Sequence, residues 1–144
     1  MGFGAVFAEV SVDSDLGEVR VRRLCAAYAA GRILNPLLAR SQYVGGLIGG
    51  LGMALHEQTV TDRATGRILG ASLADYLIPV HADIPAIDVI MVPEDDPHLP
   101  DGVKGIGMLG SVGTSAAIAN AVFHATGKRI RRLPIRIEDV MGAA

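Results

Sequence analysis

The residues of this chain that could do chemistry gather in one stretch, 101–127, where a lysine and several glycines precede an apolar run. Lys104 supplies a positive charge, and the glycines at 105, 107, 110 and 113 let the backbone bring its N–H groups close to a ligand. We therefore expect a bound phosphate here, with Lys104 as a mobile cation and a helix N-terminus as a further positive end. The alternative is a glycine-rich turn that lets a helix pack closely on a sheet, and without further context this alternative is favoured.

The string from Gly105 to Gly110 also fits GxGxxG, the dinucleotide-binding fingerprint. That fingerprint follows a buried parallel strand and is followed about 20 residues later by an acidic residue that binds ribose. Here residues 92–101 are too polar and proline-rich for a central strand, and the next acidic residue is Glu138. The context excludes a dinucleotide-binding motif.

Other groupings of reactive residue types are incomplete. His56-Glu57 resembles half of a metalloprotease helix, but the second histidine is missing. No serine lies in a GxSxG elbow, and Asp95-Asp96 falls in a polar loop where we expect a solvated turn. We predict no metal ligands and no complete catalytic constellation, so the chain is expected to contribute one wall of a larger site.

Composition narrows the possible partners. The formal charge of −2 gives no electrostatic reason to expect nucleic acid or an acidic membrane. Cys25 is the only cysteine, which excludes an internal disulfide framework, a cysteine-based zinc site and a self-contained iron–sulfur site. No signal-peptide pattern is present and residues 44–55 are too short to cross a bilayer, so we expect a cytoplasmic protein.

The first half of the chain predicts a hairpin followed by a helix. Residues 5–12 and 18–24, the latter running on to 28, flank a turn whose Gly17 suits a left-handed bulge position. Asn35 and Pro36 open a helix that should run to about His56. Each glycine inside that helix costs about 1 kcal/mol relative to alanine. Their number predicts close backbone approach, either to another helix or to a ligand.

The second half predicts shorter elements. Residues 58–70 indicate a second hairpin or long turn, 73–79 an extended piece, 88–92 a strand and 93–103 a surface loop. Residues 111–126 indicate a second helix capped by Gly127, and 130–137 close the fold as an edge strand or extended tail. The predicted fold class is α+β: a mainly antiparallel sheet with two helices packed on one face, forming a single domain over 1–144.

Three runs of residues resemble the C-terminal end of the molybdenum-binding large subunit of the xanthine dehydrogenase/aldehyde oxidase family. They are Gln42-Tyr43-Val44-Gly45-Gly46 with Gly50 to Glu57, then Asp75-Tyr76 with Pro79, then Gly102 to Gly107 with Gly113 and Ala116 to Val122. The opening Gly-Ala-Val-Phe-Ala-Glu-Val hairpin is similar as well. The resemblance covers nearly the whole chain but only the last part of that subunit.

The resemblance implies a molybdenum hydroxylase, which inserts water-derived oxygen into an aldehyde or N-heterocycle and passes electrons through iron–sulfur clusters to FAD. It implies a molybdopterin cofactor, often as its cytosine dinucleotide, held without a cysteine ligand. By family position, Gln42 and the backbone of Lys104, Gly105, Ile106 and Gly107 should approach that cofactor. The implied partners are the remainder of the molybdenum subunit and iron–sulfur and FAD subunits or domains, with a homodimer left open. The piece alone is expected neither to bind the cofactor tightly nor to turn over.

One departure from the family pattern bears on activity. The family carries a glutamate as general base directly after the Lys-Gly-Val/Ile-Gly run, and here that position holds Met108. A thioether cannot take a proton near neutral pH. Gly49 is a second departure, because the family often carries glutamine or another larger residue there.

Two other hypotheses stay open. One is a non-catalytic assembly or interaction domain that keeps the fold and binds a partner through its glycine-faced helix. The other is a stand-alone phosphate-binding protein that uses Lys104 and the 105–113 loop.

Overall fold

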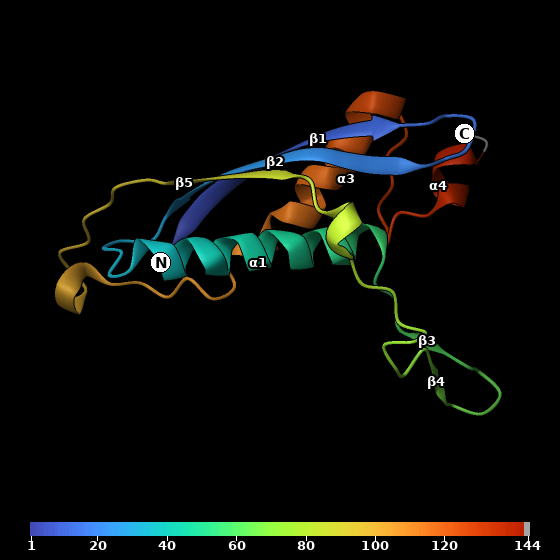
Figure 1. The fold of residues 1–144 in the computed structure, drawn as a ribbon, viewed down its shortest axis with the longest axis horizontal. Helices are drawn as coiled ribbons and strands as arrows, with labels where there is room; N and C mark the ends of the chain where they lie inside the picture. The colour runs from blue at the N-terminus through green and yellow to red at the C-terminus, as the bar shows by residue number, and fades with distance from the viewer. Residues whose placement is uncertain (143–144) are drawn as a thin grey trace.

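The structure is a computed structural model that describes residues 1–142. Figure 1 shows its arrangement: a sheet, one long helix beneath it, a second helix that passes behind it and a projecting hairpin. Its strands are β1 (Phe3–Val12), β2 (Val19–Ala29), β3 (Val60–Thr61), β4 (Ile68–Leu69) and β5 (Ala86–Met91). Its α-helices are α1 (Pro36–Leu55), α2 (Leu109–Val112), α3 (Thr114–Thr126) and α4 (Ile137–Met141), with short 3₁₀ turns at His81–Asp83 and Pro100–Gly102.

The main sheet has the strand order β1-β2-β5. β1 and β2 form the predicted antiparallel hairpin, and Gly17 in its turn has the expected left-handed φ of 68°. β5 pairs with β2 in parallel, while β3 and β4 form a separate antiparallel pair. The α+β class with mostly antiparallel strands and helices on one face is confirmed.

Helix α1 begins where its capping residues predict. The Asn35 side chain accepts a hydrogen bond from the Leu38 N–H at 3.1 Å, and Pro36 occupies the first turn, where a missing donor costs nothing. The helix ends at Leu55, one residue before the expected His56. Because this helix is long and straight, it can lie under the sheet along its length (Figure 1).

The core lies between the sheet and the helices α1 and α3. Its fully buried large side chains come from β2 (Leu24, Tyr28), α1 (Tyr43, Leu47, Leu51) and α3 (Thr114, Ile118, Val122). The rings of Tyr28 and Tyr43 stack with centroids 4.4 Å apart. This aromatic pair joins the sheet to the end of α1 that carries Gln42.

The predicted second helix, 111–126, is wrong in its first turn. The chain forms a short helix α2 over 109–112 and begins α3 at Thr114, with Gly113 at the junction. Glycine is a poor helix former, and Thr114 is held by its own contact because its Oγ1 donates to the Gly110 carbonyl at 3.0 Å. The C-terminal prediction is confirmed: Gly127 adopts a left-handed φ of 73°, and its N–H donates to the Phe123 carbonyl, which caps the end of α3.

Of the two alternatives for 130–137, an edge strand or an extended tail, the strand is wrong, and the extended piece predicted over 73–79 is wrong at its start. The Ile135 N–H donates to the Ala54 carbonyl at 2.7 Å, so this segment supplies a hydrogen-bond donor to a carbonyl in the last turn of α1. The Ile135 side chain is buried in the core. Residues 72–76 instead form a turn in which the Ser72 carbonyl accepts from Asp75 and Tyr76 N–H groups. In both places backbone N–H groups donate to a carbonyl of a helix or a turn, and the segment does not pair with a strand.

Residues 58–80 form an arm that projects from the body of the molecule (Figure 1). Its β3–β4 pair confirms the second hairpin predicted over 58–70. Seven large apolar side chains of the arm are exposed: Val60, Ile68, Leu69, Leu73, Leu77, Ile78 and Val80. Over the part of the chain that the structure describes, no helix has the length and apolar character needed to span a membrane.

Candidate functional site

Two glycine-rich segments meet where α1 crosses α2. A Cβ added at Gly46 would lie 2.8 Å from the Gly110 Cα, and one added at Gly110 would lie 2.8 Å from the Tyr43 carbonyl oxygen. A Cβ at Gly50 would overlap the Thr114 side chain. For Gly46 and Gly50, the predicted close approach of the α1 backbone to another helix is therefore confirmed. The crossing also brings the part of α1 beside Gln42 to the segment that follows Lys104.

Four other glycines of these two segments face open space. A Cβ added at Gly45, Gly49, Gly105 or Gly107 would meet no described atom within 4 Å, apart from the chain next to it. Packing within this chain therefore gives no reason for glycine at these four positions. A backbone bare of side chains is what a closely approaching outside group requires.

The loop from Gly105 to Gly107 offers unused donors. Within residues 1–142, no backbone or side-chain acceptor is hydrogen-bonded to the N–H groups of Gly105, Ile106 or Gly107. The Ile106 side chain packs against the core, and its carbonyl accepts from the Leu109 N–H at 3.2 Å. Successive free N–H groups on an anchored turn can bind the oxygens of a phosphate or pyrophosphate. The geometry fits a phosphorylated ligand.

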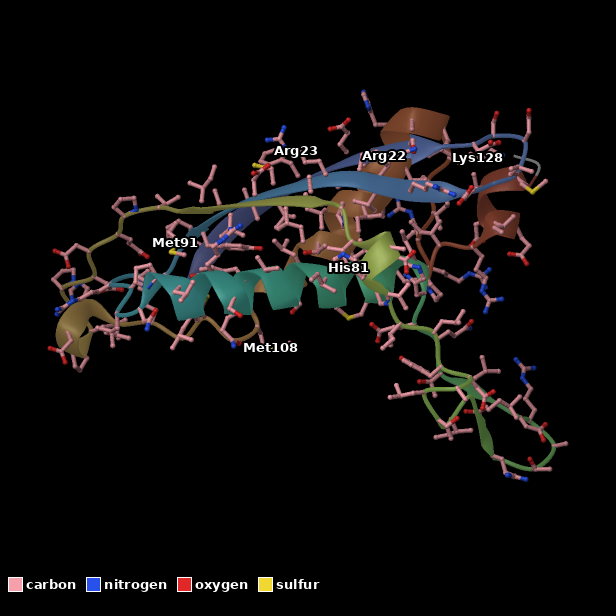
Figure 2. The ribbon with its side chains drawn as sticks, viewed as in Figure 1. Arg22, Arg23, His81, Met91, Met108 and Lys128 are labelled. Carbon is pink, nitrogen blue, oxygen red and sulfur yellow. The ribbon has the colours of Figure 1, made fainter. Side chains whose placement is uncertain are left out.

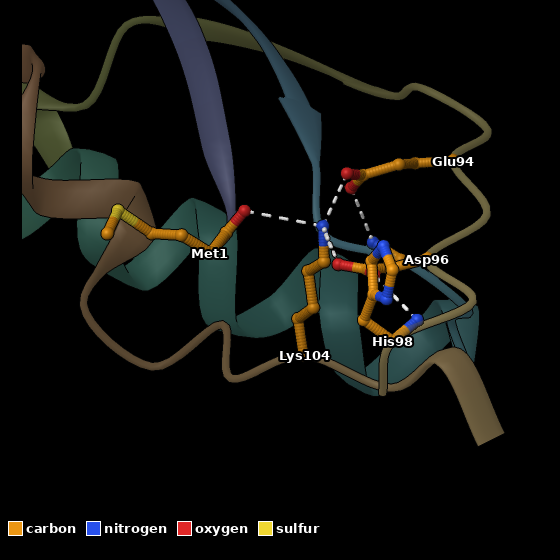
Figure 3. Close-up of polar contacts among 6 residues, drawn as sticks. Met1, Glu94, Asp96, His98 and Lys104 are labelled. Carbon is orange, nitrogen blue, oxygen red and sulfur yellow. Dashed lines mark hydrogen bonds and ion pairs between the residues drawn. The ribbon is translucent and has the colours of Figure 1, made fainter. Parts of the chain in front are cut away.

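Lys104 is not the mobile cation that the sequence predicts. Its side chain is 4% exposed, and its Nζ forms ion pairs with Glu94 and, at 3.2 Å, with Asp96 (Figure 3). The hydrogen bond with Glu94 raises the pKa of Lys104, and the same lysine lowers the pKa of both carboxyl groups. Asp96 is correspondingly not the solvated turn residue expected of the Asp95-Asp96 pair.

The predicted helix N-terminus does not add a positive end to the loop either. The helix that directly follows Gly107 is α2, which has four residues, and α3 begins farther on at the buried Thr114. Ser115 Oγ donates to the Gly50 carbonyl at 2.9 Å, so the start of α3 faces α1. Binding of an anion by the loop therefore depends on its own N–H groups.

Gln42 and Met108 border the crossing from two sides. Gln42 is exposed on α1 beside the buried Tyr43, whose carbonyl faces Gly110. The Met108 side chain is 73% exposed directly before α2, and in Figure 2 it lies on the side of α1 away from the sheet. The Met108 carbonyl accepts from the Ser111 N–H at 3.2 Å and from its hydroxyl at 3.0 Å.

Sequence reasoning missed two features of the site. Glu94 stands ten positions before Lys104, and no motif links the two; a lone acid in a proline-bounded loop before a lysine is the available signal. Tyr28 was expected only as part of a strand, yet its hydroxyl donates to the Gly110 carbonyl at 3.3 Å. Burial raises the pKa of Tyr28 to about 12, and the neighbouring Tyr43 hydroxyl is buried with no partner among the described residues.

The family described as molybdopterin cofactor-binding domain matches residues 1–85. The aldehyde oxidoreductase molybdenum-binding subunit PaoC of Escherichia coli K12 is 49% identical over 140 residues, which are 96% of this chain and 19% of PaoC. The xanthine dehydrogenase molybdenum-binding subunit of Escherichia coli O157:H7 is 37% identical over 92% of this chain and 18% of that subunit.

A solved structure shows the same fold. The aldehyde oxidoreductase of Desulfovibrio gigas aligns with 97% of this chain at a TM-score of 0.87 and 34% identity, over 15% of its own chain. This chain thus spans about a fifth or less of the length of these relatives. The glycine crossing, the matched family and the long, similar relatives lead to one assignment: the chain belongs to the molybdopterin cofactor-binding domain family, as a fragment of a molybdenum-binding subunit of the xanthine dehydrogenase type.

Proposed function

We propose that this chain forms one wall of the cofactor cleft in a molybdenum hydroxylase that oxidises an aldehyde or an N-heterocycle. The observation that carries the proposal is the pair of facing segments with open glycines, 45 and 49 on α1 and 105 and 107 on the loop. Molybdopterin, when bound, supplies the metal centre at which water-derived oxygen is transferred. The cytosine dinucleotide form would add a pyrophosphate, which suits several N–H donors in succession.

The residues of this chain bind and orient the cofactor in this proposal. The N–H groups of Gly105, Ile106 and Gly107 would donate to phosphate oxygens, because no acceptor among residues 1–142 is hydrogen-bonded to them. Gln42 offers an amide that both donates and accepts at the adjacent end of α1. Gly45 and Gly49 leave room for a closely packed neighbour.

Met108 sets the proposed activity apart from that of the family. Its exposed side chain stands where the resemblance implies a general base, and a thioether sulfur cannot accept a proton near neutral pH. The proposed enzyme therefore keeps its cofactor site but lacks the base for ordinary hydroxylation.

We also propose that the missing partners are those of the relatives' assemblies. The relatives are named as molybdenum-binding subunits, and they are several times longer than this chain. The remainder of such a subunit would cover the open side of α1 and the apolar arm 58–80, and iron–sulfur and FAD subunits or domains would receive the electrons. The fragment alone would neither hold the cofactor tightly nor turn over, and the assembly would be cytoplasmic.

Molybdenum and pterin analysis of the complete subunit tests this proposal. We expect bound molybdopterin in the wild type, its loss in Gly107→Val, where a side chain would enter the ligand space, and its retention in the matched control Ala64→Val on the arm. Neither Gly107 nor Ala64 has a left-handed φ, and Ala64 is exposed, so the control reports the folding cost of a valine outside the ligand space. A wild-type subunit with no bound pterin would overturn the proposal.

A non-catalytic interaction domain is the second candidate, favoured by Met108 and by the exposed apolar arm. It predicts a complete protein that assembles with a partner while binding neither pterin nor molybdenum. The same metal and pterin analysis separates the two.

A further inference from the structure

We propose that Lys104 is a positioning residue: its buried ammonium, clamped by Glu94 and Asp96, sets the path of residues 105–107 and does not itself bind the anion. The part of this proposal that concerns the ligand depends on the proposed function. The part that concerns the loop depends on contacts within this chain alone.

The ammonium of Lys104 has no donor left for a ligand. An ammonium has three N–H donors. Lys104 Nζ contacts Glu94 Oε1, Asp96 Oδ2 at 3.2 Å and the Met1 carbonyl at 3.3 Å (Figure 3). Recruiting it to a phosphate would break one of these contacts inside a site where the lysine is 4% exposed.

The charges around Lys104 also indicate that it does not bind the anion. The cluster contains two carboxylates against one ammonium, and the side chains of Glu94 and Asp96 are 19% and 20% exposed. Besides Lys104, the N-terminal ammonium of Met1 also lowers the pKa of Asp96, so the cluster has no excess positive charge with which to attract a nearby anion. An anion bound at residues 105–107 would be stabilised by hydrogen bonds from the loop N–H groups. The ion cluster around Lys104 would not attract it.

The clamp fixes the loop upstream of the glycines. The second oxygen of Glu94 accepts from the Gly31 N–H at 2.9 Å, and the Arg32 N–H donates to the Gly102 carbonyl at 2.8 Å. Gly31 has a φ of 66°, and a Cβ there would overlap the Gly102 carbonyl, so the two chains touch through bare backbone. Through Glu94, the side chain of Lys104 is thereby linked to Gly31, just after the end of β2. Because Lys104 directly precedes Gly105, this link fixes the start of the loop.

The crossing with α1 fixes the loop downstream. Gly110 packs against the Tyr43 carbonyl, and the Ile106 side chain packs against the core. Residues 105–107 are thus held between two anchors while their N–H groups stay free. Releasing the upstream anchor should let these N–H groups diverge without unfolding the domain.

Two single variants and their double variant test the proposal in the 144-residue chain. We expect Lys104→Met and Glu94→Gln each to lower the NMR order parameters of the Gly105 and Gly107 amides from about 0.85 to below about 0.6. Each should also raise hydrogen exchange at the Gly31 and Arg32 amides, on the order of tenfold. The double variant should add little to Lys104→Met, because both remove the same contact. Asp95→Asn is the matched control, since it removes a neighbouring charge that does not contact Lys104.

Binding separates a positioning lysine from a ligand lysine. With inorganic pyrophosphate as probe of the complete subunit prepared without its cofactor, Glu94→Gln weakens binding on the order of fivefold relative to Asp95→Asn if Lys104 positions the loop, since the loop loses its shape. Asp95→Asn removes a charge of the same sign and therefore corrects for the general electrostatic effect on the anion. If Lys104 were the ligand, Glu94→Gln would free its charge and strengthen binding relative to Asp95→Asn, and that result would overturn the proposal. Unchanged order parameters in both single variants would also overturn it. A wild-type subunit that binds no pyrophosphate counts against the proposed function alone, because the amide measurements still decide the role of Lys104.

Discussion

At the scale of single residues, the candidate site combines groups that are fully engaged with groups that are free. The Lys104 ammonium and the Tyr28 hydroxyl are engaged, whereas the N–H groups of Gly105, Ile106 and Gly107 have no described acceptor. Charge and hydroxyl groups therefore hold the backbone in place. The backbone itself presents the donors.

Met108→Glu in the complete subunit should produce a gain of aldehyde or N-heterocycle oxidation. The exposed position beside the loop leaves room for a carboxylate, which can accept a proton where a thioether cannot. Steady-state turnover with an artificial electron acceptor measures the gain, expected to be on the order of a hundredfold for a general base. Met108→Gln serves as the control of similar size without a base. Equal activity in the two variants would show that the position has no base function.

The free energy of unfolding should fall as the pH rises from about 10 to about 12. Burial raises the pKa of Tyr28 from 10.0 to about 12, so the unfolded chain releases this proton first and the folded state loses stability over that window. Below pH 10 the contribution is fully present, and across the window its loss amounts to roughly 3 kcal/mol. Urea denaturation at stepped pH measures it. Tyr28→Phe should flatten this part of the profile, and an unchanged slope in that variant would assign the loss to other groups.

At the scale of elements, glycines on two adjacent faces of α1 serve different purposes. Gly46 and Gly50 let α1 touch α2 and α3, while Gly45 and Gly49 face open space. One helix therefore has a face that packs within this chain and a face that is bare. Only the bare face is available to a cofactor or to the rest of the subunit.

The adjacent variants Gly45→Ala and Gly46→Ala should change stability in opposite directions. Alanine at 45 should stabilise the chain by about 1 kcal/mol, because helix propensity improves and nothing is displaced. Alanine at 46 should destabilise it by about 1–3 kcal/mol, because its Cβ would lie 2.8 Å from the Gly110 backbone. Urea denaturation measures both. Stabilisation by both variants would mean that α1 and α2 are not in the close contact described.

At the scale of the whole molecule, apolar surface is left uncovered in two places. The arm 58–80 exposes Leu73 at 80% and Leu77 at 66%, and the outer face of β1 exposes Phe3 and Phe7. A monomeric soluble domain rarely leaves contiguous apolar patches of this kind bare. The pattern fits a piece whose remaining contacts are made by the rest of a longer subunit.

Replacing Leu73 and Leu77 together by serine should affect the fragment and the complete subunit differently. In the 144-residue chain, the unfolding free energy should change by no more than about 0.5 kcal/mol, since both side chains are exposed. In the complete subunit the same change should lower the melting temperature, because the buried apolar contacts of the arm are lost. Arg63→Ser on the arm is the control. An unchanged melting temperature in the complete subunit would show that the arm stays exposed there.

Much of the local structure was predictable because it depends on neighbouring residues. The Asn35-Pro36 start of α1, the turn at Gly17, the cap at Gly127 and the pairing of β1 with β2 all follow from short-range rules. The resemblance of the glycine-rich runs was sufficient to identify the family. These features depend on residues that are close together in the chain, so the sequence alone is sufficient to predict them.

Tertiary structure alone decided which groups are free. The sequence shows Lys104 as a cation among glycines, but whether it is mobile depends on Glu94 and Asp96, which reach it through the path of the loop. It shows many glycines in α1, but their division into packed and bare faces depends on where α2 and α3 cross. It leaves an edge strand or an extended tail open for 130–137, and the hydrogen bond from the Ile135 N–H to the Ala54 carbonyl decides against the strand. Long-range contacts settle such questions because burial and hydrogen-bond partners are set by elements distant in the chain.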